Sequence, residues 1–145
     1  MVGFKFDEVM SGTHKFESQN EEFEMEFRVR WGPTDIIKWA ENKFTCPLEG
    51  VITIGKMCKN VPCKGTISLH YWKGILKYDM WFTHCDVIYH YVGEKRNIRP
   101  WNLHKTHTTC YGVLTRAWNR EVISKSVTHF RLKTLPAFLA SFRIT

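Results

Sequence analysis

The sequence predicts a mainly all-β protein, an antiparallel, lipocalin-like β-barrel of about seven to nine strands with one short helix after the second strand. Three observations predict this fold. Apolar and polar residues alternate with period two along most of the chain. The alternating segments are short, and turn residues separate them. Helical spacing is confined to one short segment. A β-sandwich is the competing architecture, and a single domain over residues 1–145 is expected.

The strand with the clearest alternation is Glu22–Trp31, where every second residue is apolar and the residues between them are charged. One dry face and one wet face is typical of an antiparallel sheet. An N-terminal strand is expected around Phe4–Val9, and Lys73 and Gly74 predict a tight hairpin turn. The remaining strands are expected at Glu49–Gly55, Lys64–Lys73, Ile75–Thr83, Asp86–Gly93, His107–Arg116 and Glu121–Lys133.

The helical signal begins at the sequence Gly32-Pro33-Thr34-Asp35, which combines proline with residues that cap helix N-termini. Apolar residues then follow at helical spacing, so a short helix is expected from about Thr34 to Lys43. The segment Leu135–Phe142 is compatible with one or two helical turns and equally with a closing strand.

The charge is unevenly distributed along the chain. The net charge is +7, and residues 73–145 hold 12 Lys and Arg against 4 Asp and Glu, whereas residues 1–72 hold 9 against 10. Such asymmetry can mark a face that binds anions or nucleic acid. The basic residues are mostly interleaved with apolar ones at strand spacing, and no run of five basic residues occurs. We therefore expect no nucleic-acid partner.

The sequence contains no apolar stretch of the roughly 18 residues that a membrane-spanning helix needs. Its first ten residues carry acids and lack the apolar region of a signal peptide. The five cysteines are odd in number and scattered, without a CxxC pair. These features predict reduced thiols, a cytoplasmic protein and no membrane span.

The segment Gly93–Cys110 reads as a loop that concentrates basic residues, two histidines and an indole. Arginine or protonated histidine can pair with a carboxylate or polarise a carbonyl, and aromatic rings can cover an apolar body. Ligand-binding residues are predicted in this loop and on the strands that flank it. They are Arg99, Trp101, His104, His107, Tyr89, Tyr91, Tyr111, Tyr78 and Trp81. His104, His107 and Arg99 are the candidates for catalysis. The alternative is that Trp101 closes the barrel end while the basic residues satisfy loop carbonyls.

No other catalytic or cofactor motif is evident. His104 and His107 lie three residues apart, but a mononuclear metal site needs a third ligand that the sequence does not nominate. Cys85 and Cys110 would act as nucleophiles only in an electropositive, partly exposed setting. A GxSxG elbow, a phosphate-binding glycine loop and a dinucleotide fingerprint are all absent. We therefore expect neither a metal nor an organic cofactor.

Short motifs spread along the chain resemble those of a known family. They are Phe6, Met10, Ser11 and Gly12; Phe27-Arg28-Val29-Arg30-Trp31; Gly50; Leu76, Tyr78, Met80 and Phe82; Gly93 and Lys95; Trp101 with Thr106, Thr108 and Thr109; and Phe142-Arg143-Ile144-Thr145. In these the chain is similar to the small β-rich accessory domain found beside bacterial cholesterol-oxidase-like flavoproteins of the glucose–methanol–choline oxidoreductase group. The flavin-binding part is absent from this sequence. The resemblance therefore implies a module associated with sterol or lipid metabolism, without redox activity.

These observations favour a barrel that binds a hydrophobic small molecule, such as a lipid or sterol, with the 93–110 loop holding its polar end. One alternative is a cofactor-free enzyme on the same ligand class, for instance an isomerase, a cyclase or a luciferase-type oxygenase. There a histidine would act as general base and Arg99 would stabilise an oxyanion. Another alternative is a non-catalytic interaction domain that docks an acidic partner on a basic face.

Overall fold

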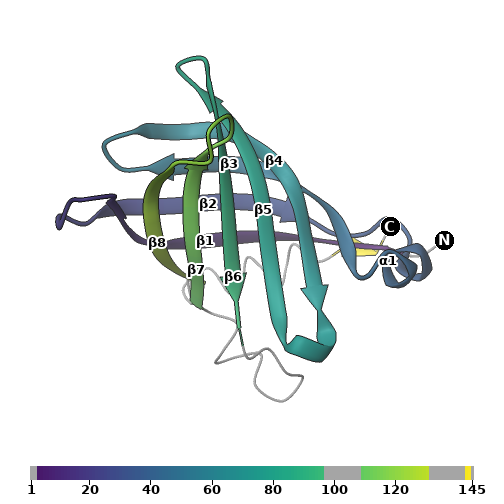
Figure 1. Ribbon diagram of the computed structural model, residues 1–145. Helices are drawn as coiled ribbons and strands as arrows, with labels where there is room; N and C mark the ends of the chain where they lie inside the picture. The colour runs from purple at the N-terminus through teal and green to yellow at the C-terminus, as the bar shows by residue number, and fades with distance from the viewer. Residues whose placement is uncertain (1–2, 97–108, 131–142, 145) are drawn as a thin grey trace.

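The computed structural model of the protein describes residues 3–96, 109–130 and 143–144 (Figure 1). The elements in these ranges are β1 (Phe4–Phe16), β2 (Phe23–Trp31), α1 (Ile36–Glu41), β3 (Thr45–Ile54), β4 (Cys58–His70), the 3₁₀ turn η1 (Tyr71–Lys73), β5 (Ile75–His84), β6 (Val87–Lys95), β7 (Thr109–Arg116), β8 (Val122–Phe130) and β9 (Arg143–Ile144).

Strands β1 to β8 form a closed antiparallel barrel. Each strand pairs with the next in sequence, and β1 pairs with both β2 and β8, which closes the sheet on itself. The short β9 adds to β1 through the pairing of Phe4 with Ile144. In Figure 1 the front strands β5 to β8 cross β1 and β2, which run behind them, at a steep angle. This closure confirms the predicted all-β barrel and excludes the sandwich.

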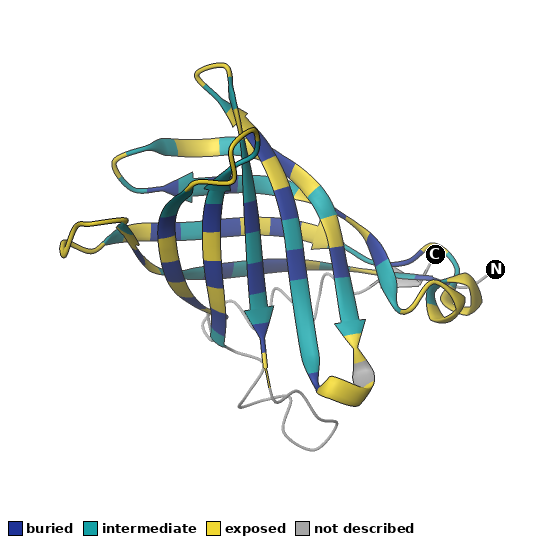
Figure 2. Ribbon diagram, viewed as in Figure 1, coloured by how far each residue is buried: buried dark blue, intermediate teal, exposed yellow. Residues whose placement is uncertain are grey.

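The predicted alternation is visible along the strands of the barrel, where buried residues alternate with intermediate or exposed ones over much of their length (Figure 2). Inward-facing side chains form one continuous core. Met10, Phe27, Ile52 and Met80 come from different walls of the barrel, and each is 0% exposed. A side chain without accessible surface borders no void that would admit a water molecule. The barrel centre is therefore filled by its own side chains at these positions.

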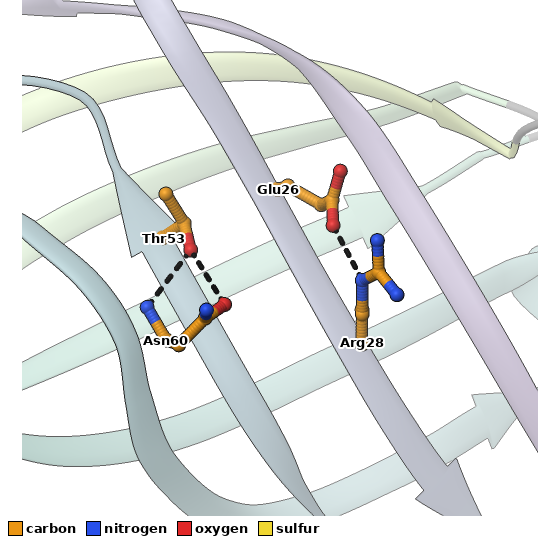
Figure 3. A network of polar contacts seen from close by, with 4 residues as sticks. All are labelled: Glu26, Arg28, Thr53 and Asn60. Atoms are coloured by element: carbon orange, nitrogen blue, oxygen red, sulfur yellow. Dashed lines mark hydrogen bonds and ion pairs between the residues drawn. The ribbon is translucent and has the colours of Figure 1, made fainter.

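Polar side chains on the outer faces of β2, β3 and β4 interact with one another, within a strand or between neighbouring strands (Figure 3). Arg28 Nε donates to Glu26 Oε1 over 2.6 Å, and Asn60 contacts the Thr53 hydroxyl through its backbone nitrogen at 2.9 Å. The charges of β2 thus lie on a solvated face, as the sequence predicts. Exposed pairs of this kind contribute at most about 1 kcal/mol to stability.

The helix α1 begins at Ile36 and is shorter than the predicted Thr34–Lys43. The carboxylate of Asp35 caps it by accepting a hydrogen bond from the Ile37 backbone nitrogen over 3.0 Å. The helix joins the barrel through Trp39, whose ring lies edge-on to Phe4 at 5.4 Å and to Phe44 at 4.9 Å. The segment Leu135–Phe142, for which the sequence left helix and strand open, lies outside the described residues.

Two glycines make room for the ring of Tyr91 inside the barrel. Gly93 and Gly112 face each other across β6 and β7. A Cβ added at Gly112 would lie 2.4 Å from the Tyr91 hydroxyl oxygen, and one at Gly93 would lie 2.8 Å from the same oxygen. Both distances are far inside van der Waals contact. The absence of two Cβ atoms therefore lets a large aromatic ring pack against this wall.

We expect Gly112→Ala to lower the free energy of unfolding by about 1–3 kcal/mol, because the new methyl group overlaps the Tyr91 ring. Urea unfolding followed by tryptophan fluorescence measures the change. The matched control is Val113→Thr at the neighbouring exposed position, which should stay within about 0.5 kcal/mol of the wild type. Equal stabilities of Gly112→Ala and the wild type would show that the ring does not depend on this space.

Candidate functional site

The candidate site is a group of three polar side chains inside the barrel, Glu8, Tyr78 and Lys95, which we call the Glu8 cluster. The Tyr78 hydroxyl donates a hydrogen bond to Glu8 Oε1, and Lys95 Nζ lies 3.2 Å from the same oxygen. Lys95 Nζ also lies 5.1 Å from the centre of the Tyr78 ring. Lys95 and Tyr78 are 0% exposed and Glu8 is 3% exposed. A carboxylate and an ammonium group thus form an ion pair without solvent.

The strand register explains how these residues meet. Glu8 has the same parity on β1 as the interior residue Met10, so its side chain points inward. Lys95 continues the inward row of β6 that contains Tyr91 and Gly93. The strand β1 pairs with β2, β8 and β9, and not with β5 or β6. The Glu8 contacts therefore span the barrel interior and do not follow the sheet.

The Glu8 cluster adjoins a second buried pair, formed by Tyr91 and Cys110. Glu94 pairs with Tyr111 across β6 and β7, which places Lys95 beside Cys110. The Tyr91 hydroxyl lies 3.6 Å from Cys110 Sγ. Burial raises the pKa of Tyr78 and of Tyr91 well above the usual tyrosine value, and burial also raises the pKa of the Cys110 thiol despite the nearby Lys95. All three groups are therefore neutral at physiological pH.

A separate polar contact lies further along β1, where His14 is 1% exposed. His14 Nε2 lies 2.9 Å from the Gly55 carbonyl, which can only accept a hydrogen bond, so Nε2 carries the proton. Nδ1 then accepts from the Ser124 hydroxyl over 3.0 Å. Burial lowers the pKa of His14. Through these hydrogen bonds the neutral ring connects β1 with β8 and with the end of β3.

The residues predicted for ligand binding separate into three groups. Arg99, Trp101, His104 and His107, which include all candidates for catalysis, lie outside the described residues. Tyr78 and Tyr91 point into the barrel and are fully buried, and Tyr89 is partly buried against Phe82. Tyr111 and Trp81 point outward and are 58% and 43% exposed. The structure therefore brings Tyr78 and Tyr91 together and does not bring Tyr111 or Trp81 to them.

The sequence analysis missed Glu8 and assigned Lys95 to a loop. The structure corrects this, because Gly93–Lys95 belong to β6 and Lys95 is an interior residue. The sequence did contain a signal for both residues, because each lies an even number of positions from interior residues of its own strand. Glu8 alternates in phase with Phe6 and Met10, and Lys95 with Tyr91 and Gly93. A charged residue at a dry position of an alternating strand is the mark of a buried ionic site.

The cysteines of the described residues have no partner thiol. Burial raises the pKa of Cys46 to about 11 and that of Cys63 to about 12, so neither supplies a thiolate at neutral pH. Among the described residues, no three His, Cys, Asp or Glu side chains are close enough together to hold a metal ion. None of the helices described here has the length and apolar character needed to cross a bilayer.

Comparison of the chain with protein-family models, with curated proteins and with solved structures finds no match.

We expect Lys95→Met to lower the free energy of unfolding by about 3–5 kcal/mol, because it leaves the Glu8 carboxylate buried without a cation. The double variant Glu8→Gln with Lys95→Met removes both charges at similar volume. It should regain the wild-type stability or exceed it by about 1–4 kcal/mol. Urea unfolding of the variants measures both effects.

The control for this series is Arg30→Met, which breaks the exposed ion pair of Arg30 Nε with Asp7 at 2.6 Å and should cost at most about 1 kcal/mol. A double variant as unstable as Lys95→Met would show that the loss comes from packing and not from the unpaired charge.

The buried neutral His14 should make stability depend on pH. Its pKa is lowered from the usual 6.5, so the unfolded chain binds a proton at this residue more readily than the folded protein. The stability contributed by neutral His14 is complete above about pH 6.5 and is lost as the pH falls toward the folded-state pKa.

We therefore expect the wild type to lose more stability than His14→Gln between about pH 8 and pH 5, measured by urea unfolding at each pH. His129→Gln, at an exposed position of β8, serves as control and should follow the wild type. Parallel curves for the wild type and His14→Gln would assign the pH dependence to other groups.

Proposed function

We propose that the protein binds a hydrophobic small molecule inside the barrel, and that the Glu8 cluster contacts its polar end. The observation that carries this proposal is the solvent-free ion pair of Glu8 with Lys95 at 3.2 Å. Ionisable residues that are buried away from water inside a protein are typical of functional sites. Under this proposal the polar contact lies on β1, β5 and β6, whereas the sequence expectation centred it on residues 93–110.

Energetics support a functional reading of the ion pair. Removing two charges from water costs several kcal/mol per ion, and well-packed apolar residues of the same size are often as stable or more so. The barrel already has a core of aliphatic and aromatic side chains around this pair. Stability alone would therefore favour apolar residues in place of Glu8 and Lys95. Contact with the polar group of a ligand is a function that would explain why the two charges are present.

The side chains at the centre can make room for a ligand. Met10, Met25 and Met80 project into the core from β1, β2 and β5 and are at most 2% exposed. Methionine is unbranched and changes shape at low cost, so it suits binding sites that adapt to their ligands. The filled centre is then the state without ligand, and binding displaces these side chains.

The chemical class of the ligand follows from the lining and from the family resemblance. Most of the buried side chains are apolar, which favours a ligand with an apolar body, while Tyr78, Lys95 and Glu8 can donate or accept hydrogen bonds at one end. The resemblance to an accessory domain of sterol-oxidising flavoproteins favours a sterol or another lipid of this kind. Eight-stranded barrels of lipocalin type hold one such molecule.

The test is native mass spectrometry of the freshly purified protein, followed by organic extraction and by binding titrations with a panel of long-chain alcohols and steroids. We expect a co-purified apolar molecule or saturable binding of one equivalent. The double variant Glu8→Gln with Lys95→Met should bind ligands that carry a polar end about 10–100-fold more weakly, since a hydrogen bond to a charged group contributes about 1.5–3 kcal/mol.

Arg30→Met is the control for the titrations, because Arg30 pairs with Asp7 on the outer surface and should leave affinity unchanged. The proposal would be overturned if no apolar molecule co-purified with the protein and no member of the panel bound to it. Conversion of the extracted or added ligand into a product would assign an enzymatic function to the same site.

A further inference from the structure

We infer that Lys95 captures a carbonyl group: its amine forms an imine with an apolar aldehyde or ketone that enters the barrel. This inference rests on the proposed function and names the chemical class of the ligand. Lys95 is the one fully buried lysine among the residues that the structure describes. Its nitrogen is 3.2 Å from the Glu8 carboxylate, and both side chains lie in the barrel interior. Proteins that form imines use lysines that are withdrawn from water, and Lys95 is withdrawn in this way.

The first requirement for imine formation is a neutral amine. The Glu8 oxygen next to Lys95 Nζ can accept the ammonium proton directly, without a water molecule. The Tyr78 hydroxyl donates to the same Glu8 oxygen and keeps the carboxyl group in position.

The reaction balances with the groups of the Glu8 cluster alone. The neutral Lys95 nitrogen attacks the carbonyl carbon, and a C–N bond forms as the C=O π bond breaks. One proton of the nitrogen passes to the carbonyl oxygen, which becomes a hydroxyl group. Glu8 returns its proton to this hydroxyl, which leaves as water while the C=N bond forms. The product is a protonated imine whose positive charge replaces that of the ammonium group. The Glu8 carboxylate remains as its counter-ion, so the net charge of the site does not change.

The charges of Glu8 and Lys95 also favour an aldehyde or ketone over a carboxylic acid as the ligand. The described interior offers one cation, Lys95, and Glu8 already neutralises it. A ligand carboxylate would bring a second anion next to Glu8 with no further cation in contact. A neutral carbonyl adds no charge, and its apolar body is compatible with Phe27 and Tyr91, which are both fully buried.

The experiment treats the full chain with one equivalent of decanal at neutral pH and reduces any imine with cyanoborohydride. Intact mass should rise by the mass of decanal less one oxygen atom, and peptide mapping should place the adduct on Lys95. The exposed Lys64 and Lys125 are internal controls for random reaction. We expect labelling of Lys95 to exceed theirs at least about tenfold, as positioned groups react faster than free ones.

Two variants test which side chains the formation of the adduct requires. Lys95→Arg keeps a cation beside Glu8 but cannot form an imine, so the adduct should disappear, while Lys125→Arg should label like the wild type. Glu8→Gln still accepts from Tyr78 but cannot take a proton, so trapping should slow by at least about tenfold. An unchanged rate in Glu8→Gln would overturn the role of Glu8.

Decanol, which cannot form an imine, separates this inference from the proposed function. Saturable decanol binding with adducts spread over exposed lysines and none on Lys95 would overturn the imine and leave the binding function intact. Absence of a Lys95 adduct, together with no co-purified molecule and no binding of decanol or of any other member of the panel, would overturn both. The wild-type peptide map decides the question even if a variant at position 95 fails to fold.

Discussion

The ion pair that crosses the barrel interior sets the strictest constraint on how the strands of this structure are placed. Glu8 on β1 has no backbone pairing with β5 or β6, yet its carboxylate contacts Tyr78 and Lys95 from those strands. A buried carboxylate without a cation would cost several kcal/mol, so the opposite walls must be held at the distance that this contact requires. Closure of the barrel through β1 provides that distance, because it fixes β1 between β2 and β8.

The interior side chains differ in size from one part of the barrel wall to another. This difference leaves room in the barrel interior for large and charged side chains. Along much of β7 and β8 the interior residues are small, with Cys110, Gly112, Ser126 and Thr128 all buried. The neighbouring strand β6 contributes a bulky side chain to the space that they leave. Tyr91 packs over Gly112, where a Cβ would lie 2.4 Å from its ring. Small residues on β7 therefore make room for a large side chain of the adjacent strand.

The sequence predicted much of the fold because period-two alternation reports which face of a strand is dry. The barrel, the helix after Asp35 and the hairpin before β5 follow from this pattern and from turn residues. The full length of β1 was missed because Ser11, Gly12 and Thr13 interrupt the alternation. The meeting of Glu8 with Lys95 could not be predicted, since it joins walls that share no hydrogen bonds. Such a contact depends on the closure of the eight strands into a barrel. The alternation of residues within one strand does not predict that closure.

Sequences that fold well place each residue type where local structure and core packing agree, and the exceptions concentrate at functional sites. Glu8 and Lys95 are such exceptions, because both are charged residues at dry positions of otherwise apolar rows. His14 is a milder case, since its neutral ring satisfies both nitrogens with Ser124 and Gly55 and serves structure alone. The Glu8 cluster differs, because apolar residues often replace a buried ion pair without loss of stability. A carboxylate, an ammonium group and a phenol lie in contact there, and the proposed reactivity of the interior rests on this combination.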